Sequence, residues 1–232
     1  MSTDFCTYTL EASTAVIRMD DGKANALSNE MIEGLISALA RAEKEATAAV
    51  LTGRPDRFCA GFDLKVMMSG PDNAVALLRR GADLYMKLYG LPIPLVIACT
   101  GHALAGGSLV LLTADRRYGA SGPYKIGLNE VAIGLPVPVL AMELARDRLV
   151  GTELVRATLL AQIYAPDEAA KIGYLDEVVA ADEVLGRAKE EAARLGALSR
   201  SAFEASKVRL RGKTIAHITA TLDDDMKTLM RG

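Results

Sequence analysis

One carboxylate stands in an otherwise apolar stretch of the sequence, YKIGLNEVAIGL, where glycines flank it and Pro136 follows. This residue, Glu130, has two interpretations. In an apolar pocket its pKa would rise towards neutrality, which would suit it to remove and return protons. At a helix start it would instead be a surface carboxylate stabilised by the helix dipole. Taken alone, the stretch around Glu130 favours the surface interpretation.

Two other segments join a strand to a helix through small residues. In FCAGFDLK, Ala60 and Gly61 precede Phe62, and Asp63 can cap the helix that follows. In GHALAGGSLV, the backbone turns at residues 105–107 into an apolar helix. The first N–H groups of a helix have no partner within it and carry partial positive charge, so two such ends facing one point would hold an oxyanion. For either loop alone, close packing of a helix on a strand is the simpler explanation.

Several other kinds of chemistry are disfavoured. The two histidines, His102 and His217, are far apart and share no ligand spacing, which argues against a catalytic zinc site. The sequence has no GxSxG, GxxxxGK[ST] or GxGxxG motif. We interpret His102, which follows a buried strand, as a satisfied core or turn residue. Cys59 is interpreted as a packing residue, because only a helix end would lower its pKa.

The elements that position these residues alternate between strand and helix. Strands are predicted at 13–20, 48–52 and 91–101, around residues 117 and 125, and at 174–179; helices are predicted after Ser28 and at 103–115, 137–149 and 166–173. The segment GRPDRFCAGFD is predicted to be a loop. After Ala181 the sequence is helical, with separate helices at 181–198, 199–212 and 221–230. We therefore predict one α/β domain with a largely parallel sheet, made of a core (1–180) and a C-terminal helical extension (181–232).

Composition sets further limits. Of 232 residues, half are hydrophobic, and the net charge of −2 gives no reason to expect nucleic acid. The one basic cluster, at 207–213, is a solvated helix face or a phosphate contact. Three cysteines without CxxC spacing predict reduced thiols. No signal peptide and no membrane-spanning stretch is predicted, so a cytoplasmic protein is expected.

Five segments, in this order, resemble the crotonase superfamily, the enoyl-CoA hydratase/isomerase group. They are ANALS (24–28), FCAGFDL (58–64), GHALAGGSLVLLTAD (101–115), IGLNEVAIGL (126–135) and PDEAAKIGYLDEVV (166–179). The resemblance implies a spiral of ββα units, a homotrimer or dimer of trimers with the C-terminal extension as its trimerisation element, and acyl-CoA thioester substrates. It implies an oxyanion hole made by the backbone amides of Phe62 and Gly106.

The same resemblance bears on the acid and base. Hydratases of the family carry two glutamates; one corresponds to Glu130, but the other position, one turn beyond the oxyanion-hole glycine, is Leu109. A single carboxylate suffices for a 1,3-proton shift, as in the Δ3,Δ2-enoyl-CoA isomerases, with Ile126, Leu128, Val131 and Ile133 as apolar surroundings. The alternatives are hydration, thioester hydrolysis or decarboxylation at the same hole, or a catalytically silent acyl-CoA-binding or RNA-binding homologue.

The coenzyme A arm is also placed by resemblance. The backbone expected to cradle adenine and pantetheine comprises Ala24, Ala26, Cys59, Ala60, Asp63 and Leu64. Lys23 is either a phosphate contact or a solvated turn lysine, and Lys207 and Arg211 are weaker candidates for the phosphates. Coenzyme A enters as part of the substrate, and no separate cofactor, metal, membrane or nucleic acid is expected.

Overall fold

The structure, a computed structural model, describes residues 5–229. The strands are β1 Cys6–Glu11, β2 Thr14–Met19, β3 Ala48–Thr52, β4 Asp56–Cys59, β5 Leu95–Cys99, β6 Gly101–Leu104, β7 Arg116–Ala120, β8 Ile126–Gly127 and β9 Glu177–Val179. The helices are α1 Asn29–Glu45, α2 Leu64–Met67, α3 Pro71–Tyr89, α4 Gly106–Thr113, α5 Val139–Arg148, α6 Leu154–Thr158, α7 Pro166–Ile172, α8 Val184–Gly196 and α9 Arg200–Leu229, with 3-10 turns η1 Val131–Ile133 and η2 Gly151–Glu153.

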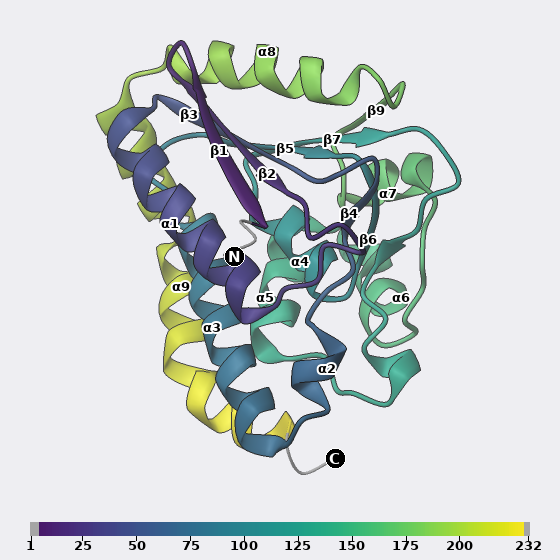
Figure 1. The fold of residues 1–232 in the computed structure, drawn as a ribbon. Helices are drawn as coiled ribbons and strands as arrows, with labels where there is room; N and C mark the ends of the chain where they lie inside the picture. Colours follow the sequence, from purple (N-terminus) through teal and green to yellow (C-terminus); the bar gives the residue numbers. More distant parts are fainter. Residues whose placement is uncertain (1–4, 230–232) are drawn as a thin grey trace.

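The strands form two sheets. The larger has six strands in the order β1-β2-β3-β5-β7-β9, all parallel except the β1–β2 hairpin. The smaller has three parallel strands in the order β4-β6-β8. Three times in succession, a strand of the large sheet is followed by a strand of the small sheet and then by helix (β3-β4-α2-α3, β5-β6-α4, β7-β8-α5). This is the expected spiral of ββα units (Figure 1).

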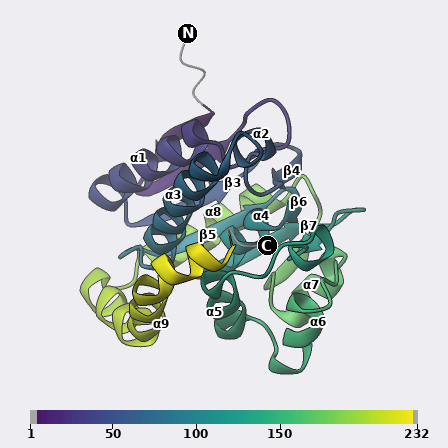
Figure 2. The ribbon, with the colours of Figure 1, turned by 90° about the horizontal axis from the view of Figure 1, so that it is seen from below.

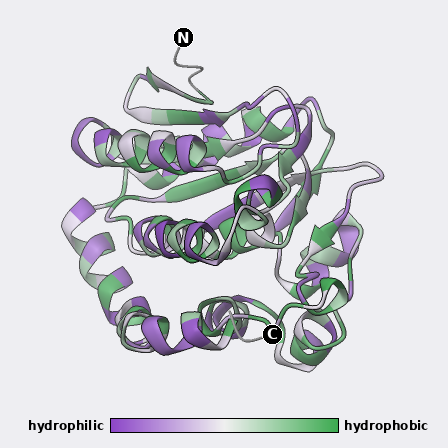
Figure 3. Ribbon diagram, turned by 60° about the horizontal axis from the view of Figure 1, so that its bottom comes forward, coloured by the Kyte–Doolittle hydropathy of each residue, from purple (hydrophilic) through white to green (hydrophobic). Residues whose placement is uncertain are grey.

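Helices cover both faces of the large sheet. Helix α8 lies over β3, β5 and β7 on one face, while α4 and its neighbours lie beneath the sheet in the view of Figure 1. Small side chains such as Ala48, Ala98, Ala188 and Ala192 allow α8 to approach the strands closely. Hydrophobic segments gather in the central strands, and the surrounding helices mix hydrophobic and hydrophilic residues (Figure 3). The central strands therefore read as continuous apolar runs rather than alternating ones.

Several local predictions are confirmed. Ser28 caps α1, its hydroxyl oxygen accepting the Met31 N–H at 3.2 Å. Helix α4 is buried on all sides, as its unbroken apolar sequence predicts. Helix α7 begins at Pro166 and ends at Gly173, whose φ of +105° is the left-handed conformation that glycine adopts readily.

Other elements differ from the predictions. The predicted loop 53–63 contains strand β4, which is only four residues long and begins with exposed Asp56 and Arg57. Strand β1 and helix α3 are not among the predicted elements, and the predicted helix at 103–115 begins only at Gly106, because residues 101–104 form strand β6. The C-terminal residues form one continuous helix, α9, so the prediction of separate helices at 199–212 and 221–230 is wrong within the described range. Gly212 does not interrupt α9, because one glycine in a helix costs only about 1 kcal/mol.

The segment after residue 181 packs on the same chain. Helix α8 covers the large sheet, and α9 lies against α5 and α3 (Figure 2). Ile218 and Met226 are the apolar residues of α9 that are fully buried in this packing. Within the described residues, the C-terminal extension therefore packs directly on the core of its own chain.

Candidate active site

The three residues expected to act on substrate follow the three strands of the small sheet. Phe62 comes three residues after β4, Gly106 two after β6, and Glu130 three after β8. Because these strands are parallel, their carboxyl ends meet at one edge of the sheet. Segments far apart in the sequence are therefore brought to a single edge.

The loop at Phe62 is held by backbone hydrogen bonds on both sides of that residue. The Ala60 N–H donates to Ala24 O at 3.1 Å, Leu27 N–H donates to Gly61 O at 2.8 Å, and Asp63 N–H donates to Leu27 O at 3.3 Å. Within residues 5–229, the Phe62 N–H itself has no such partner. The loop leaves one amide open between two that are fixed.

The second open amide lies at the start of α4. The Gly106 N–H has no hydrogen-bond partner among residues 5–229 either. It follows Ala105, which has φ 48° and ψ −125°, and the Ala105 carbonyl accepts the Ser108 hydroxyl at 2.8 Å. A Cβ added to Gly61 would lie 3.2 Å from Gly106 N, so the two loops touch where glycine leaves room. Two unpartnered N–H groups on touching loops can serve one oxyanion.

Glu130 is a buried carboxylate. It is 8% exposed, its Oε2 has no hydrogen-bond partner in the described chain, and it caps no helix through its side chain. Burial raises the pKa of Glu130, because few groups compensate for the lost hydration of the charged form. The surface interpretation of Glu130 is therefore wrong. A carboxylate with a raised pKa is a stronger base than an ordinary one and can accept and return a proton.

The apolar surroundings differ in part from the prediction. Ile126 and Leu128 are buried, but Val131 and Ile133 are 42% and 54% exposed. Two buried tyrosines that the sequence did not single out, Tyr85 and Tyr174, lie near enough for the Glu130 charge to raise their pKa values further, although burial is the main cause. The Leu-Leu-x-x-x-x-x-Leu-Tyr spacing of 77–85 predicts a helix that contains Tyr85, but it gives no sign of the contacts that this residue makes.

Leu109 occupies the position of the missing second carboxylate. It is the fourth residue of α4, and its N–H donates to Ala105 O at 3.2 Å, so it lies one helical turn beyond Gly106. Its side chain is buried among apolar residues of the core. Glu130 is thus the carboxylate at this edge of the small sheet.

The residues expected to cradle coenzyme A fall into two adjoining segments. Ala24 and Ala26 are partly buried beside the loop that contains Ala60, and Asp63 caps α2 by accepting the Lys65 N–H at 2.8 Å. The turn at 20–26 depends on a residue that the sequence did not single out: buried Asn25 donates to the Met19, Arg57 and Phe58 carbonyls.

The side chains at this site vary in exposure. Lys23 is exposed, and its carbonyl accepts a 2.9 Å hydrogen bond from Arg54. Leu64 is 68% exposed at the start of α2. Burial raises the pKa of the Cys59 thiol to about 12, so it is protonated at neutral pH and its interpretation as a packing residue is confirmed. His102 lies half-buried within strand β6 rather than in a turn, and its Nδ1 accepts the Lys125 N–H at 3.0 Å, which confirms that it is a satisfied structural residue.

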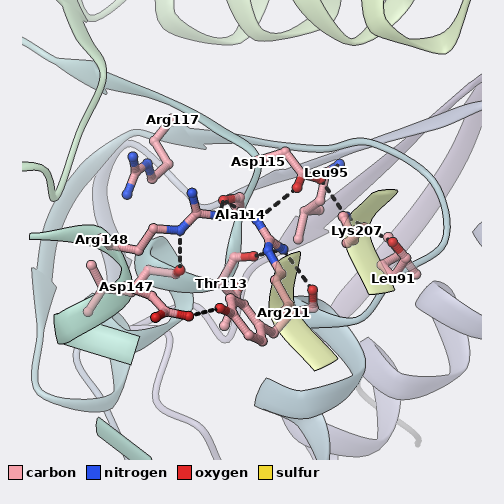
Figure 4. A network of polar contacts seen from close by, with 12 residues as sticks. Leu91, Leu95, Thr113, Ala114, Asp115, Arg117, Asp147, Arg148, Lys207 and Arg211 are labelled. Carbon is pink, nitrogen blue, oxygen red and sulfur yellow. Dashed lines mark hydrogen bonds and ion pairs between the residues drawn. The ribbon is translucent and has the colours of Figure 1, made fainter. Parts of the chain in front are cut away.

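Lys207 and Arg211 are not at a phosphate site. Lys207 Nζ lies 2.7 Å from an Asp115 oxygen and donates to the Leu91 carbonyl at 2.8 Å. Arg211 lies 2.9 Å from the other Asp115 oxygen and donates to the carbonyls of Tyr89, Thr113 and Ala114 (Figure 4). Both cations are buried and fully used in fixing α9 to the core. The prediction that they contact a phosphate, or form a solvated face, is wrong.

The fold and these groups define a class of protein: a ββα spiral with two open amides and a buried carboxylate of raised pKa at one sheet edge. Residues 9–230 match the enoyl-CoA hydratase/isomerase family. The chain belongs to this family.

Three relatives are described as isomerases or as a hydratase. The chain is 30% identical to human mitochondrial enoyl-CoA delta isomerase 1, over 94% of this chain and 74% of that protein. A Mycobacterium tuberculosis protein described as an enoyl-CoA isomerase is 38% identical with a TM-score of 0.92, over 96% of this chain and 98% of that one. Another structure of the same protein describes it as a probable enoyl-CoA hydratase, EchA3. The enoyl-CoA hydratase EchA3 of Mycobacterium ulcerans is also 38% identical, with a TM-score of 0.93 over 98% and 100%. Isomerases and a hydratase are therefore equally similar to this chain.

Two features of residues 5–229 concern membranes and metal ions. No helix within 5–229 has the length and hydropathy needed to cross a membrane. No three His, Cys, Asp or Glu side chains in the same range are grouped as metal ligands.

Proposed function

We propose that this protein is a Δ3,Δ2-enoyl-CoA isomerase that uses Glu130 as its only acid and base. The observation that carries the proposal is the pairing of a buried Glu130, whose Oε2 has no partner, with a buried Leu109 where the family's hydratases have a second glutamate. One carboxylate can move a proton from one carbon to another. Holding a water molecule and also delivering a proton benefits from two.

The reaction follows from these groups. The thioester oxygen of a 3-enoyl-CoA accepts hydrogen bonds from the Phe62 and Gly106 amides, which makes the C2 protons more acidic. The Glu130 carboxylate removes a C2 proton, and the negative charge of the resulting dienolate rests on the thioester oxygen. Protonated Glu130 then gives that proton to C4, and the double bond now lies between C2 and C3. The carboxylate is regenerated, so the step balances without a co-reactant.

A raised pKa serves both halves of this cycle. A carboxylate with an ordinary pKa would be a weak base towards a C2 proton. Burial raises the pKa of Glu130 and so reduces the pKa difference between this carboxyl group and the C2–H of the substrate. The same burial excludes water, which would otherwise compete for the proton.

Other assignments rest on the same site. The substrate's coenzyme A portion would lie along residues 23–26 and 59–64, where Arg54 donates a 2.9 Å hydrogen bond to the Lys23 carbonyl and both cations could meet a phosphate. Assembly as a homotrimer or dimer of trimers, and a cytoplasmic location, stay predictions; the human relative is mitochondrial by name.

Hydration is the second candidate, since a hydratase is as similar to this chain as an isomerase. Thioester hydrolysis, decarboxylation and a silent acyl-CoA- or RNA-binding role are further alternatives. A site with both amides open and one buried Glu130 oxygen without a partner speaks against silence, because unpartnered buried polar groups lower stability and a silent protein would gain nothing from them.

The test uses purified protein with 3-hexenoyl-CoA and 2-hexenoyl-CoA in separate reactions, followed by product analysis. We expect conversion of the first to the 2-trans isomer, and a loss of about 10³-fold in kcat for Glu130→Gln. Glu143→Gln, on α5 beyond the site, serves as the matched control and should retain activity. Rapid hydration of 2-hexenoyl-CoA would refute the isomerase proposal.

A further inference from the structure

Tyr85 on α3 touches both halves of the hole. Its ring packs edge-on against the Phe62 ring, with centroids 6.2 Å apart and planes at 83°. Its hydroxyl donates a 2.9 Å hydrogen bond to the Gly106 carbonyl. The side chain is fully buried, so this hydroxyl is a core polar group with one defined partner. No other described side chain joins the two residues in this way.

Helix α3 is shaped to hold Phe62. Gly81 and Tyr85 are four residues apart and therefore lie on the same face of the helix. A Cβ on Gly81 would overlap the Phe62 ring, so the ring fills the space above this glycine and lies against Tyr85. Fixing the Phe62 side chain limits the rotation of its backbone and hence the direction of its N–H.

The contact with Gly106 has the same consequence for the other amide. Gly106 and Gly107 begin α4, and glycine is a poor helix former because its backbone is free to move. A Cβ at Gly106 would lie 2.6 Å from the Tyr85 hydroxyl and 3.4 Å from Gly61 Cα, so tyrosine and glycine fit each other. The hydroxyl thus anchors the first turn of α4 next to the strained Ala105.

We propose that Tyr85 is a positioning residue that aligns the Phe62 and Gly106 amides on a single oxygen atom, an inference that rests on the proposed oxyanion hole. It does not touch the reacting atoms. Its effect is on the strength with which the two amides polarise the thioester carbonyl. Small displacements of such donors lower rates substantially, because the hydrogen bonds matter most where charge develops.

The test compares Tyr85→Phe, which removes only the hydroxyl, with Tyr89→Phe one turn later on α3. Tyr89 directs its hydroxyl to Asp147, away from the hole, and is the matched control. The Tyr85 variant retains the ring, and the Gly106 carbonyl remains within the first turn of α4, so we expect it to fold. Denaturant unfolding of both variants verifies this.

Two measurements separate positioning from packing. The first is the infrared C=O stretch of hexanoyl-CoA labelled with ¹³C at the thioester, a saturated ligand that cannot isomerise; hydrogen bonds from the hole lower this frequency. We expect Tyr85→Phe to return it towards its value in water, and Tyr89→Phe to leave it unchanged. The second is turnover of 3-hexenoyl-CoA, for which kcat should fall about tenfold in Tyr85→Phe with KM changed less than about twofold.

The outcomes are distinguishable. If Tyr85→Phe keeps the wild-type frequency and kcat, Tyr85 only fills the core and the inference is overturned, although the isomerase proposal stands. If the wild type lowers the frequency and Tyr85→Phe reverses it, but 3-hexenoyl-CoA is not isomerised, the positioning role is supported and the isomerase proposal fails. A wild-type protein that leaves the stretch at its value in water has no hole, and both proposals fall.

Discussion

The two ends of helix α4 differ in whether the polar groups there have hydrogen-bond partners. At the first end, the Phe62 and Gly106 amides and one Glu130 oxygen have no partner within the described residues. At the other end, Arg148 and Arg211 donate to the carbonyls of the last turn, as Figure 4 shows. The helix is equally buried at both ends.

The two ends of α4 also differ in the partners of the carboxylate that lies at each end. Asp115, just beyond α4, has Lys207 and Arg211 within 3 Å and also accepts the Leu95 N–H at 2.8 Å. Within residues 5–229, Glu130 forms no ion pair, and its Oε2 has no hydrogen-bond partner. A buried polar group without a partner costs about 1–3 kcal/mol. The first end of α4, the open end, therefore lowers stability, whereas the last end, the sealed end, contributes to it through Arg148 and Arg211.

The largest effect is expected at the sealed end. Arg211→Leu removes one partner of Asp115 and three hydrogen bonds to core carbonyls, so we expect the free energy of unfolding to fall by about 3–5 kcal/mol. Activity per folded molecule should change less than about twofold. Denaturant unfolding gives the first quantity and kcat corrected for folded fraction the second.

Arg209→Leu is the control for this prediction, because Arg209 is exposed on the same helix. It should change the free energy of unfolding by less than about 0.5 kcal/mol. Equal effects of the two substitutions would show that the sealed end is not where α9 is held.

At the open end, Gly106→Ala should affect activity more than stability. Its Cβ would lie 2.6 Å from the Tyr85 hydroxyl, which moves the first turn of α4 and the amide it carries. We expect kcat on 3-hexenoyl-CoA to fall about 10²-fold, the scale of losing one oxyanion donor. Gly212→Ala on α9, whose Cβ meets nothing within 4 Å, should leave kcat unchanged and raise stability slightly. Normal turnover in Gly106→Ala would contradict the assignment of this amide.

The open end was more predictable from the sequence than the sealed end. Small residues in FCAGF and LAGGS, and a lone carboxylate in an apolar stretch, are local signals at this end. Each alone favours a simpler interpretation, and only the order of the five segments that resemble the family predicts a site there. Lys207, Arg211 and Asp115 gave no such signal. Asp115 precedes the two cations by more than 90 residues. In the sequence alone, a basic cluster is interpreted as a solvated face, because nothing local shows that the fold brings an acid to it.

The elements missed have a physical reason too. Strands β4 and β6 have four residues each, too few to show a period, and β1 is exposed along most of its length. Tyr85 became visible only with α3 in place, because its partners Phe62 and Gly106 lie 23 and 21 residues away on other elements. Tertiary contacts, not local preference, decide these features.

Placing a second carboxylate at the open end tests how far the reaction depends on Leu109. Leu109→Glu puts an acid one turn beyond Gly106 on α4. We expect hydration of 2-hexenoyl-CoA to rise about tenfold above the wild-type background, since a correctly placed acid or base contributes at least that much. Leu109→Gln, of the same shape without the proton-transfer group, should give no gain. A glutamate variant that folds but hydrates no faster would show that more than the carboxylate is lacking.

The smallest effect is the stability of Glu130→Gln. Burial raises the pKa of folded Glu130 above its ordinary value of 4.5, so between the two values the folded protein binds more protons than the unfolded chain. Stability from this group therefore falls as pH rises through that window. Glutamine does not titrate. Relative to wild type, the free energy of unfolding of Glu130→Gln should therefore be unchanged below pH 4.5 and higher by about 1 kcal/mol above the raised pKa.

Denaturant unfolding of wild type and Glu130→Gln from pH 4 to 8 measures this gain, with Glu204→Gln on the exposed side of α9 as the surface control. A variant that is less stable than wild type at pH 8 would mean that Glu130 is stabilised by its surroundings, as Asp115 is. The contrast between the two ends of α4 would then fail. A variant that is inactive yet more stable at pH 8 would show that the open end has exchanged stability for proton transfer.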